Sequence, residues 1–402
     1  MPKAFIFYQY FYPDDVISSI HFSELCNGLV DRGWEVSAFP CNRGCRDESR
    51  RYSPRDEWRN ILIKRLWRPK LEQASTLGRL FNALWLIVRW SLLALHPKLK
   101  PDVLVVGTDP VLSIVVAPFW RFFKPQTKIV HWCFDLYPEA AFAEGILRKE
   151  SRLAKLICKF LKHSYAACNL IVDIGPCMRQ LLADYGSPAK TLTLVPWAME
   201  EPDSALRISV QERESIFSGA NLALMYSGNF GRAHSYLDLL ELVRLLRSED
   251  VQLAFSVRGN REEELYRAVG TDDFNVRFVP FAPQEKLRER LACADIHIVS
   301  LRDEWTGTVV PSKFFGALAV GRPVLFCGRS DSAIAKWIAE HEIGWVLSRG
   351  RGNEVAKELR AFAASPSARE LMFQHCHRVY HEQFSRDIII DRWATSLSNL
   401  IR

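Results

Sequence analysis

The sequence lacks the patterns by which many proteins are classified at first sight. Its 10 cysteines contain no Cys-x-x-Cys pair, which argues against a zinc or disulfide framework. Half of them lie inside apolar runs, as buried thiols of a reducing compartment do. The Gly-x-Gly-x-x-Gly fingerprint of dinucleotide-binding proteins is missing, and so are low-complexity segments and short repeats. The function therefore has to be inferred from less specific motifs and from their order.

The sequence also has no long segment of charge of one sign. The 53 basic and 46 acidic residues give a net charge of +7 and are mixed along the chain, with no basic or acidic tail. This balance favours an acidic partner such as a nucleotide diphosphate or an anionic lipid. Nucleic acid is the weakest option, since no aromatic stacking platform accompanies the basic residues.

The alternation of helical and strand patterns predicts an α/β protein of two doubly wound parallel sheets. The length of 402 residues suits two domains of about 150–200 residues each. We expect one domain over residues 1–197, a polar linker over 198–220 and a second domain over 221–386. A terminal helix over 387–402 is expected to cross back to the first domain.

A hydrophobic run of membrane-spanning length is also missing. Residues 80–95 are apolar almost throughout but carry Asn82 and Arg89, and they fall short of the roughly 20 residues that cross a bilayer. The basic and tryptophan-rich surroundings, over 64–100, are typical of an interfacial membrane anchor. A helix packed on the first sheet is the compatible alternative. The first residues are typical of a strand rather than a signal peptide, so we expect a cytoplasmic protein at the inner face of the membrane.

Residues 306–326 carry the most specific local signal. A polar turn with Gly307 leads into Pro311-Ser-Lys, and then into a helix of small and apolar residues and a short apolar strand. Ser312 is expected to cap this helix, and Lys313 to face a bound anion. In α/β sheets, ligands bind at the carboxyl ends of strands against helix N-termini. Solubility and capping alone are the simpler explanation of such residues.

A second loop, Tyr226-Ser-Gly-Asn-Phe-Gly-Arg-Ala-His, follows a predicted strand of the same sheet. Gly228 and Gly231 would let backbone N–H groups approach a pyrophosphate, with Arg232 beside it. Many Gly-x-x-Gly segments are only turns. Because this loop and residues 307–313 come from one sheet, we predict that they converge on a nucleotide-diphosphate site.

Further motifs extend over nearly the whole chain. They are Tyr12-Pro-Asp-Asp, Arg32-Gly-Trp-Glu-Val, Thr108-Asp-Pro, Phe134-Asp-Leu-Tyr-Pro-Glu, Val195-Pro-Trp-Ala, Ala294-Asp-Ile-His-Ile-Val-Ser-Leu and Gly321-Arg-Pro-Val. In this order and spacing, the chain resembles a family-4 retaining glycosyltransferase of the GT-B fold, of the bacterial cell-surface polysaccharide and glycolipid type. The resemblance implies two Rossmann-like domains facing a central cleft, with the nucleotide-sugar in the second domain and the acceptor in the first.

The resemblance also implies roles for individual residues. Arg232 and Lys313 would bind the diphosphate as catalytic groups, and the remaining donor-binding positions are Gly228, Asn229, Gly231, His234, Trp305, Thr306, Gly307, Thr308, Pro311 and Ser312. The chain departs from the family pattern at two glutamate positions, which hold Thr308 and Gly316, and at two basic positions, which hold Asn229 and His234. Recognition of the ribose is left unassigned.

On the acceptor side, the resemblance places Asp135 as the third catalytic residue. Its companions are Asp14, Ser18, Ser19, His21, Asp109 and Glu139. Simpler roles exist: Asp135 and Asp109 as helix caps, and His21 as a structural residue. His131, alone on a strand, is expected to be a packed core residue.

The expected reaction is transfer of a hexosyl or N-acetylhexosaminyl group from a UDP-sugar to a lipid-linked or saccharide acceptor, with retention. Such a transfer needs a stabilised leaving diphosphate but no protein nucleophile. The sequence has no Asp-x-Asp pair, so neither a metal nor another cofactor is expected. A nucleotide-sugar epimerase of the same architecture and a degenerate nucleotide-sugar-binding subunit are the alternatives.

Overall fold

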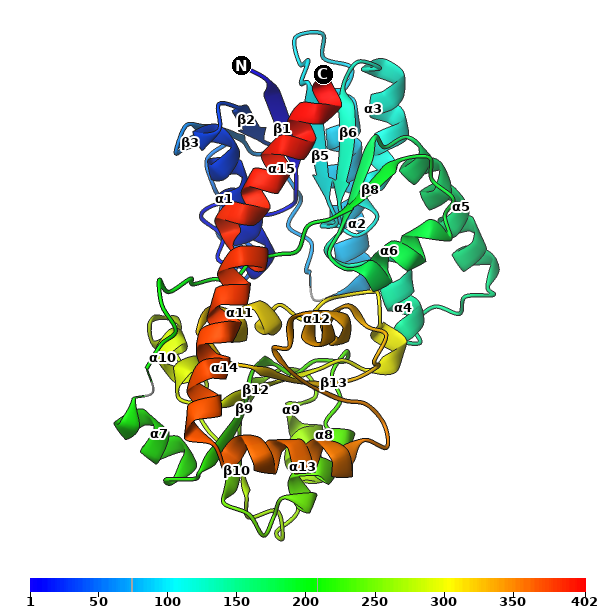
Figure 1. Ribbon diagram of the computed structural model, residues 1–402. Helices are drawn as coiled ribbons and strands as arrows, with labels where there is room; N and C mark the ends of the chain where they lie inside the picture. Colours follow the sequence, from blue (N-terminus) through cyan, green and yellow to red (C-terminus); the bar gives the residue numbers. More distant parts are fainter. Residues whose placement is uncertain (74, 208) are drawn as a thin grey trace. The chain divides into compact units, whose positions relative to one another are not determined.

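The computed structural model describes residues 1–73, 75–207 and 209–402, and the chain divides into two compact units (Figure 1). The first unit comprises Met1–Val195 and Ile389–Arg402, and the second Pro196–Ile388. Each unit is a parallel sheet with helices packed on it. The predicted class, two doubly wound α/β sheets, is confirmed.

The sheet of the first unit has the strand order β3-β4-β2-β1-β5-β6-β7-β8, and only β3 runs antiparallel to its neighbour. The strands are β1 (Lys3–Phe7), β2 (Glu35–Ala38), β3 (Arg55–Trp58), β4 (Ile61–Lys64), β5 (Val103–Gly107), β6 (Lys128–Trp132), β7 (Leu170–Asp173) and β8 (Lys190–Thr193). Central strands such as β5 are apolar and buried on both faces, because helices cover both sides of a parallel sheet. The β3–β4 hairpin was not predicted, since β3 is polar and exposed.

Helices follow most of these strands. They are α1 (Ile17–Asp31), α2 (Thr76–Leu93), the 3₁₀ turn η1 (Ser113–Val116), α3 (Ala117–Phe123), α4 (Glu139–Ala143), α5 (Arg152–Ala166) and α6 (Pro176–Ala183). The C-terminal helix α15 (Arg386–Ile401) returns to this unit, as predicted, and packs along α1 (Figure 1). Trp393 of α15 contacts Trp132 with ring centroids 5.0 Å apart, and Asp391 forms an ion pair with Arg32.

The second unit contains a six-stranded sheet of order β11-β10-β9-β12-β13-β14, parallel throughout. The strands are β9 (Leu222–Asn229), β10 (Val251–Arg258), β11 (Val276–Phe278), β12 (Ile296–Ser300), β13 (Val324–Cys327) and β14 (Gly344–Leu347). The helices between them are α8 (Leu237–Leu245), α9 (Glu262–Ala268), the 3₁₀ turn η2 (Gln284–Lys286), α10 (Leu287–Ala292), the 3₁₀ turn η3 (Asp303–Trp305), α11 (Lys313–Ala319) and α12 (Ala333–His341).

The second unit is larger than the sequence analysis expected. Helix α7 (Val210–Phe217) lies within residues 198–220, where a linker was predicted. Its Ile216 and Phe217 are buried beside β9, so the segment belongs to the core despite its polar composition. Three further elements precede α15, and the sequence analysis did not identify them. They are the helices α13 (Gly352–Ala363) and α14 (Pro366–Val379) and the π-helical turn η4 (Tyr380–Phe384). Their amphipathic sequences bury one narrow face, which is easily missed.

In both sheets the strand order reverses once. The reversal lies between β1 and β5 in the first unit and between β9 and β12 in the second. At such a point the loops leave the two central strands toward opposite faces of the sheet, which opens a crevice at the carboxyl edge. The loops that carry the predicted site residues leave β1, β5 and β6 in the first unit and β9 and β12 in the second, so each unit has candidate residues at or next to its reversal point.

Helix α2 has two different faces. Leu86 and Trp90 are fully buried, and the Trp90 indole N–H donates to the Phe39 carbonyl at 2.8 Å. The other face is exposed: the side chains of Leu80, Phe81 and Leu84 are 61%, 59% and 55% exposed. Including Trp90 in a membrane anchor was therefore wrong, because it belongs to the core. In the part of the chain that the structure describes, no helix combines the length and apolar composition needed to cross a bilayer.

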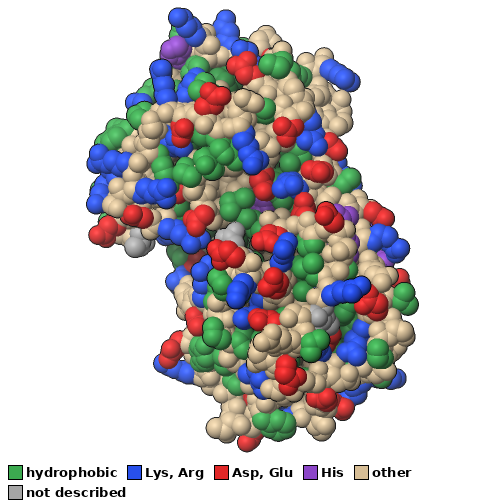
Figure 2. All heavy atoms as spheres, turned by 90° about the vertical axis from the view of Figure 1, so that its left-hand side faces the viewer, with side chains coloured by type: hydrophobic (Ala, Val, Ile, Leu, Met, Phe, Trp, Pro, Cys, Tyr) green, Lys and Arg blue, Asp and Glu red, His purple; other side chains and the backbone are tan. Residues whose placement is uncertain are grey.

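Basic and acidic side chains are interspersed on the face drawn in Figure 2, in agreement with their mixing in the sequence. Neither sign forms a continuous band on that face.

We expect the close approach of α15 to α1 to depend on Gly28. A Cβ atom at Gly28 would lie 2.5 Å from Ile390 Cγ2, so Gly28→Ala should lower the free energy of unfolding by about 1–3 kcal/mol. Combining it with Ile390→Ala removes the clash, and the double variant should lose less stability than the sum of the single changes. Urea denaturation of the four proteins measures this coupling, and strict additivity would contradict it.

Candidate active site

In the second unit, β9 and β12 separate toward their carboxyl ends. They pair only at Leu224 with Ile296 and at Met225 with His297, although β9 continues to Asn229 and β12 to Ser300. The loops beyond these strands are nevertheless tied together. The Arg302 N–H donates to the Ala233 carbonyl at 2.8 Å. The two loops predicted to converge are thus neighbours at the point where the strand order reverses.

Lys313, at the start of α11, reaches across this opening. Its ammonium donates to the Tyr226 hydroxyl at 2.8 Å and to the Asn229 carbonyl at 3.0 Å. It also lies 4.1 Å from the centre of the Tyr226 ring. Burial lowers the pKa of Lys313 from 10.5 to about 7, and none of the ion pairs found among the described residues gives it a carboxylate. An anion bound here would favour its charged form.

His234 fills the same opening from the β9 side. Its Nδ1 lies 2.7 Å from the Ser300 carbonyl, which only accepts hydrogen bonds, so Nδ1 carries the proton. Burial and the nearby charge of Lys313 lower the pKa of His234 to about 3. The imidazole is therefore neutral, with Nε2 as a hydrogen-bond acceptor, and it does not replace the basic residue that the family pattern has at this position.

Glycines shape the loop after β9. Gly228 has φ of 124°, a conformation that favours glycine, and a Cβ there would lie 3.5 Å from Lys313 Cε. Gly231 lies beside Asn229 and Asn260. Asn229 and Arg232 are exposed at this edge of the sheet. The loop thus presents backbone and polar side chains around Lys313, with Arg232 on its outer side.

The loop after β12 contains polar atoms that the protein itself does not satisfy. Trp305 is buried, and its indole N–H and the Thr306 hydroxyl find no acceptor or donor among the residues that the structure covers. Thr308 is satisfied locally, because its hydroxyl donates to the Trp305 carbonyl at 2.8 Å. Gly307 between them has φ of 88°. Trp305 and Thr306 can therefore hydrogen-bond to a ligand, whereas Thr308 acts within the turn.

Contrary to the prediction, Ser312 does not cap α11. Its backbone is already helical, with φ of −63° and ψ of −20°, and its side chain makes no capping hydrogen bond. A capping residue needs an extended backbone to point its oxygen back at the helix. The turn starts one residue earlier, where the Pro311 carbonyl accepts from the Phe314 N–H. The Ser312 hydroxyl is consequently not committed to the helix.

In the first unit, Asp109 and Asp135 follow β5 and β6. Burial and the charge of Asp135 raise the pKa of Asp109 from 3.8 to about 7, and burial raises that of Asp135 to about 6. The Asp135 side chain is nevertheless exposed, so its shift should be smaller than that of half-buried Asp109. Among the described helices, none is capped by the Asp109 side chain. The two carboxyl groups instead form an acidic pair that titrates near neutral pH.

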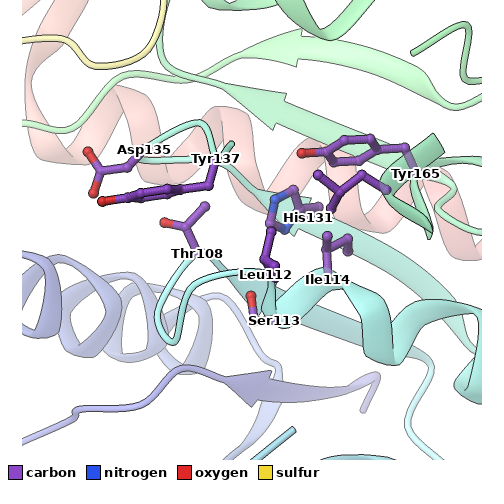
Figure 3. Close-up of a pocket in the computed structure, with 9 residues that line it drawn as sticks. Thr108, Leu112, Ser113, Ile114, His131, Asp135, Tyr137 and Tyr165 are labelled. Carbon is purple, nitrogen blue, oxygen red and sulfur yellow. The ribbon is translucent and has the colours of Figure 1, made fainter. Parts of the chain in front are cut away.

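A cavity of about 10 Å³ lies next to Asp135 (Figure 3). Thr108, Tyr137 and Tyr165 line it together with Ser113 of η1. Its volume matches a single water molecule rather than a sugar. His131 also lines it, and its Nδ1–H donates to the Val106 carbonyl at 2.9 Å. Burial lowers the pKa of His131 to about 4. His131 is thus a packed core residue, as predicted.

Most other predicted acceptor-side residues have structural partners. One oxygen of Asp14 accepts from the Cys45 N–H at 3.0 Å and the Tyr52 hydroxyl at 3.1 Å. Ser19 is buried and donates to the Asp14 carbonyl, while Ser18 is hydrogen-bonded to Tyr8. These contacts hold the loop between β1 and α1.

His21 and Glu139 are likewise engaged with the protein. His21 is buried and packs near Phe134, with ring centroids 5.9 Å apart. One Glu139 oxygen accepts from the Tyr185 hydroxyl at 2.6 Å, and burial raises the pKa of Glu139. Of the acceptor-side candidates, Asp109 and Asp135 are therefore best placed for substrate. Tyr8 and Tyr137, which the sequence analysis missed, lie beside this pair; their position after a strand end was the available signal.

The raised pKa of Asp109 predicts a pH-dependent stability. The folded protein keeps this proton up to about pH 7, whereas the unfolded chain releases it near pH 4, so the stabilisation is lost as pH rises from 4 to 7. Asp109→Asn should therefore be more stable than the wild type by roughly 2 kcal/mol at pH 8 and equal to it at pH 4. Urea denaturation at both pH values measures this, and a pH-independent difference would contradict the assignment.

Comparisons with known proteins match each of the two units separately. Residues 18–199 match the model of "Glycosyltransferase Family 4", and residues 221–365 match that of "Glycosyl transferases group 1". The chain is 26% identical over 257 residues to "Probable glycosyltransferase WbjE" of Pseudomonas aeruginosa. That match covers 61% of this chain and 62% of the relative, which is less than two thirds of the relative's length.

Solved structures share the fold over the whole chain. Sucrose-phosphate synthase from Thermosynechococcus elongatus superposes with a TM-score of 0.71 at 15% identity, covering 100% of this chain and 99% of that one. Anabaena HepE in complex with UDP gives a TM-score of 0.66 at 13% identity, covering 99% and 100%. The two family matches fall on the two units in the order that the GT-B fold requires. The chain belongs to the family-4 glycosyltransferases of the GT-B fold.

Proposed function

We propose that the protein transfers a sugar from a UDP-sugar to a lipid-linked or saccharide acceptor, with retention and without a metal ion, in the synthesis of cell-surface polysaccharide or glycolipid. The observation that carries the proposal is the Lys313 ammonium, which bridges the loops at the reversal point of the second sheet without a carboxylate partner among the described ion pairs. A half-buried cation of this kind suits a diphosphate.

The donor would bind at the carboxyl edge of β9 and β12. Lys313 and Arg232 would balance the charge that develops on the leaving diphosphate, and the glycines at 228 and 231 would let it approach the backbone. Trp305 and Thr306 would use their unsatisfied polar atoms on the donor. UDP is favoured as the nucleotide because HepE, a protein of the same fold, is described in complex with UDP.

The acceptor would bind to the first unit beside Asp109 and Asp135. Asp135, exposed and with its pKa raised to about 6, is ionised at neutral pH and can orient an acceptor hydroxyl. Asp109, whose pKa is about 7, can donate or accept a hydrogen bond there. Because fixed cations can carry the charge of the leaving group, the reaction needs no protein nucleophile.

The exposed face of α2 supports attachment to a membrane surface from the cytoplasmic side. Leu77, Leu80, Phe81 and Leu84 are more than half exposed, an unusual concentration of large apolar side chains on one helix. Arg79 and Arg89 lie among them, and Lys98 and Lys100 follow. An apolar strip with basic neighbours fits the interface of an anionic bilayer.

Two other functions fit the architecture less well. A nucleotide-sugar epimerase needs its acid and base groups around one sugar and would exchange the C2 proton without an acceptor. A degenerate subunit would bind nucleotide-sugar without turnover, and the threonine at 308 and glycine at 316 keep this alternative open. Incubation of labelled UDP-sugars with membrane extract, with and without acceptor, separates the three.

Binding of UDP-glucose should depend on Lys313 and on pH. A bound diphosphate raises the pKa of Lys313 above its free value of about 7, so affinity should be full below pH 7 and fall as pH rises to 9. Lys313→Ala should weaken binding about 10- to 100-fold. Calorimetric titration measures both effects.

Lys313→Arg is the matched control for that measurement. An arginine stays charged, so the variant should bind UDP-glucose with an affinity that does not change between pH 7 and pH 9. Equal binding by the wild type and Lys313→Ala would remove Lys313 from the donor site and with it the main support for the proposed function.

Membrane attachment should depend on the exposed face of α2. Leu80→Glu combined with Leu84→Glu should abolish sedimentation with phosphatidylglycerol vesicles and leave the Tm unchanged, since both side chains are exposed. Phe274→Glu, at a 67% exposed position of the second unit, is the matched control and should sediment like the wild type. Undiminished sedimentation of the α2 variant would reject this surface.

A further inference from the structure

Arg68 differs from the other buried arginines of the chain. Arg43, Arg65, Arg68 and Arg322 are all less than 9% exposed. Arg322 donates to five backbone carbonyls, and Arg65 donates to the Tyr12 and Ser53 carbonyls and to Asp56. All three guanidinium nitrogens of Arg68, which is 0% exposed, lack a hydrogen-bond acceptor among the described residues. A buried guanidinium without acceptors is costly, so the site calls for an anion.

The surroundings hold Arg68 in place without satisfying it. Its N–H donates to Asn42 Oδ1 at 3.0 Å, and its carbonyl accepts from Arg43 Nε at 2.9 Å. Glu48 is the nearest carboxylate, 3.8 Å from the guanidinium, which is beyond hydrogen-bond reach. The other Glu48 oxygen accepts from the Gln73 N–H at 2.7 Å. The Gln73 side-chain amide is a further buried donor for which the described residues supply no acceptor.

This cluster lies at the reversal point of the first sheet. The Gln9 N–H donates to the Asp109 carbonyl and the Cys41 N–H to the Gln9 carbonyl, each at 2.9 Å, and Asn42, the next residue, accepts from the Arg68 N–H. Arg68 is thus linked to the loops that follow β1 and β5, and its charge partly offsets the burial that raises the pKa of Asp109. Gln73 belongs to the same cluster through Glu48. The cluster is therefore near Asp109, one of the two carboxyl groups that the proposed function assigns to the acceptor.

We propose that Arg68 and Gln73 bind the phosphate groups of a lipid-linked acceptor. The planar guanidinium matches phosphate oxygens in a bidentate manner, and phosphate would satisfy the donors that the protein leaves open. The choice of a lipid phosphate follows from α2, which begins three residues after Gln73 and exposes Leu77, Leu80 and Phe81. A hydrocarbon chain leaving the phosphate would meet this apolar face. The inference rests on the proposed function and specifies the acceptor.

Glu48 controls access to Arg68. Its carboxylate is 20% exposed and lies 3.8 Å from the guanidinium, so it has to turn aside when a phosphate binds. Its negative charge also opposes the phosphate. Glu48→Gln keeps an oxygen for the Gln73 N–H and removes the charge, so it should bind the acceptor phosphate more tightly.

The test uses the full chain carrying Lys313→Ala, so that the donor site contributes little to diphosphate binding. Farnesyl diphosphate serves as the probe, with inorganic diphosphate and octyl glucuronide as comparisons, and calorimetric titration gives the affinities. Arg68→Met should weaken farnesyl diphosphate binding at least about tenfold, and Glu48→Gln should strengthen it. Farnesyl diphosphate should bind more tightly than either comparison compound.

Stability measurements distinguish this role from a structural one. Because the Arg68 guanidinium makes no hydrogen bond to the described residues, Arg68→Met should leave the Tm of the free protein unchanged or raise it. The matched change Arg65→Met removes a satisfied guanidinium and should lower the Tm. A fall in Tm for Arg68→Met with no effect of Glu48→Gln on affinity would overturn the proposal.

The comparison compounds decide the acceptor class. Equal affinity for inorganic diphosphate would reject the lipid, and tighter binding of octyl glucuronide would replace the phosphate with an acidic saccharide. UDP-glucose is also titrated into the Arg68→Met variant of a chain with native Lys313. This measurement distinguishes a failure of the lipid-phosphate inference from a failure of the proposed function. Retained UDP-glucose binding leaves the donor site intact, whereas its absence from the wild type would reject the proposed function itself.

Discussion

The hydrogen bonds from Lys313 to the Tyr226 hydroxyl and the Asn229 carbonyl are the contacts on which the candidate donor site depends. β9 and β12 stop pairing after Met225 and His297, so the ammonium lies where these two strands have separated. Burial lowers its pKa, and the neutral His234 adds no competing charge. The site is therefore short of negative charge, which is the condition for binding a diphosphate.

In the first unit, burial raises pKa values instead of lowering them, because the buried groups are acids. There, Asp109 and Asp135 lie at neighbouring strand ends, and burial raises their pKa values toward neutrality. Arg68 is buried in the same region, and its guanidinium finds no acceptor among the described residues. Acid and base thus coexist without a direct hydrogen bond between them, an arrangement that a polar substrate would complete.

Helix α2 joins the core and the surface. Trp90 and Leu86 fix one face to the sheet, and this frees Leu80, Phe81 and Leu84 to remain exposed without loss of the fold. Since the segment before α2 contains Gln73 and Arg68, the exposed apolar face and the buried cation are close in the chain. A membrane surface and a phosphate carried by a lipid are chemically related partners for these two features.

The sequence by itself determined the two α/β units, the return of the last helix and the two loops around Lys313, because strand and helix periodicity, glycine turns and motif order are local signals. Helices α7, α13 and α14 escaped it, since their apolar faces are narrow. Only the tertiary structure decided that Ser312 does not cap α11, that Asp14 and Glu139 are hydrogen-bonded to tyrosines and that Trp90 belongs to the core. It also decided that the Arg68 guanidinium finds no acceptor in the part of the chain that the structure covers. These properties depend on contacts between residues far apart in the chain, and no local pattern encodes which partner a buried polar atom finds.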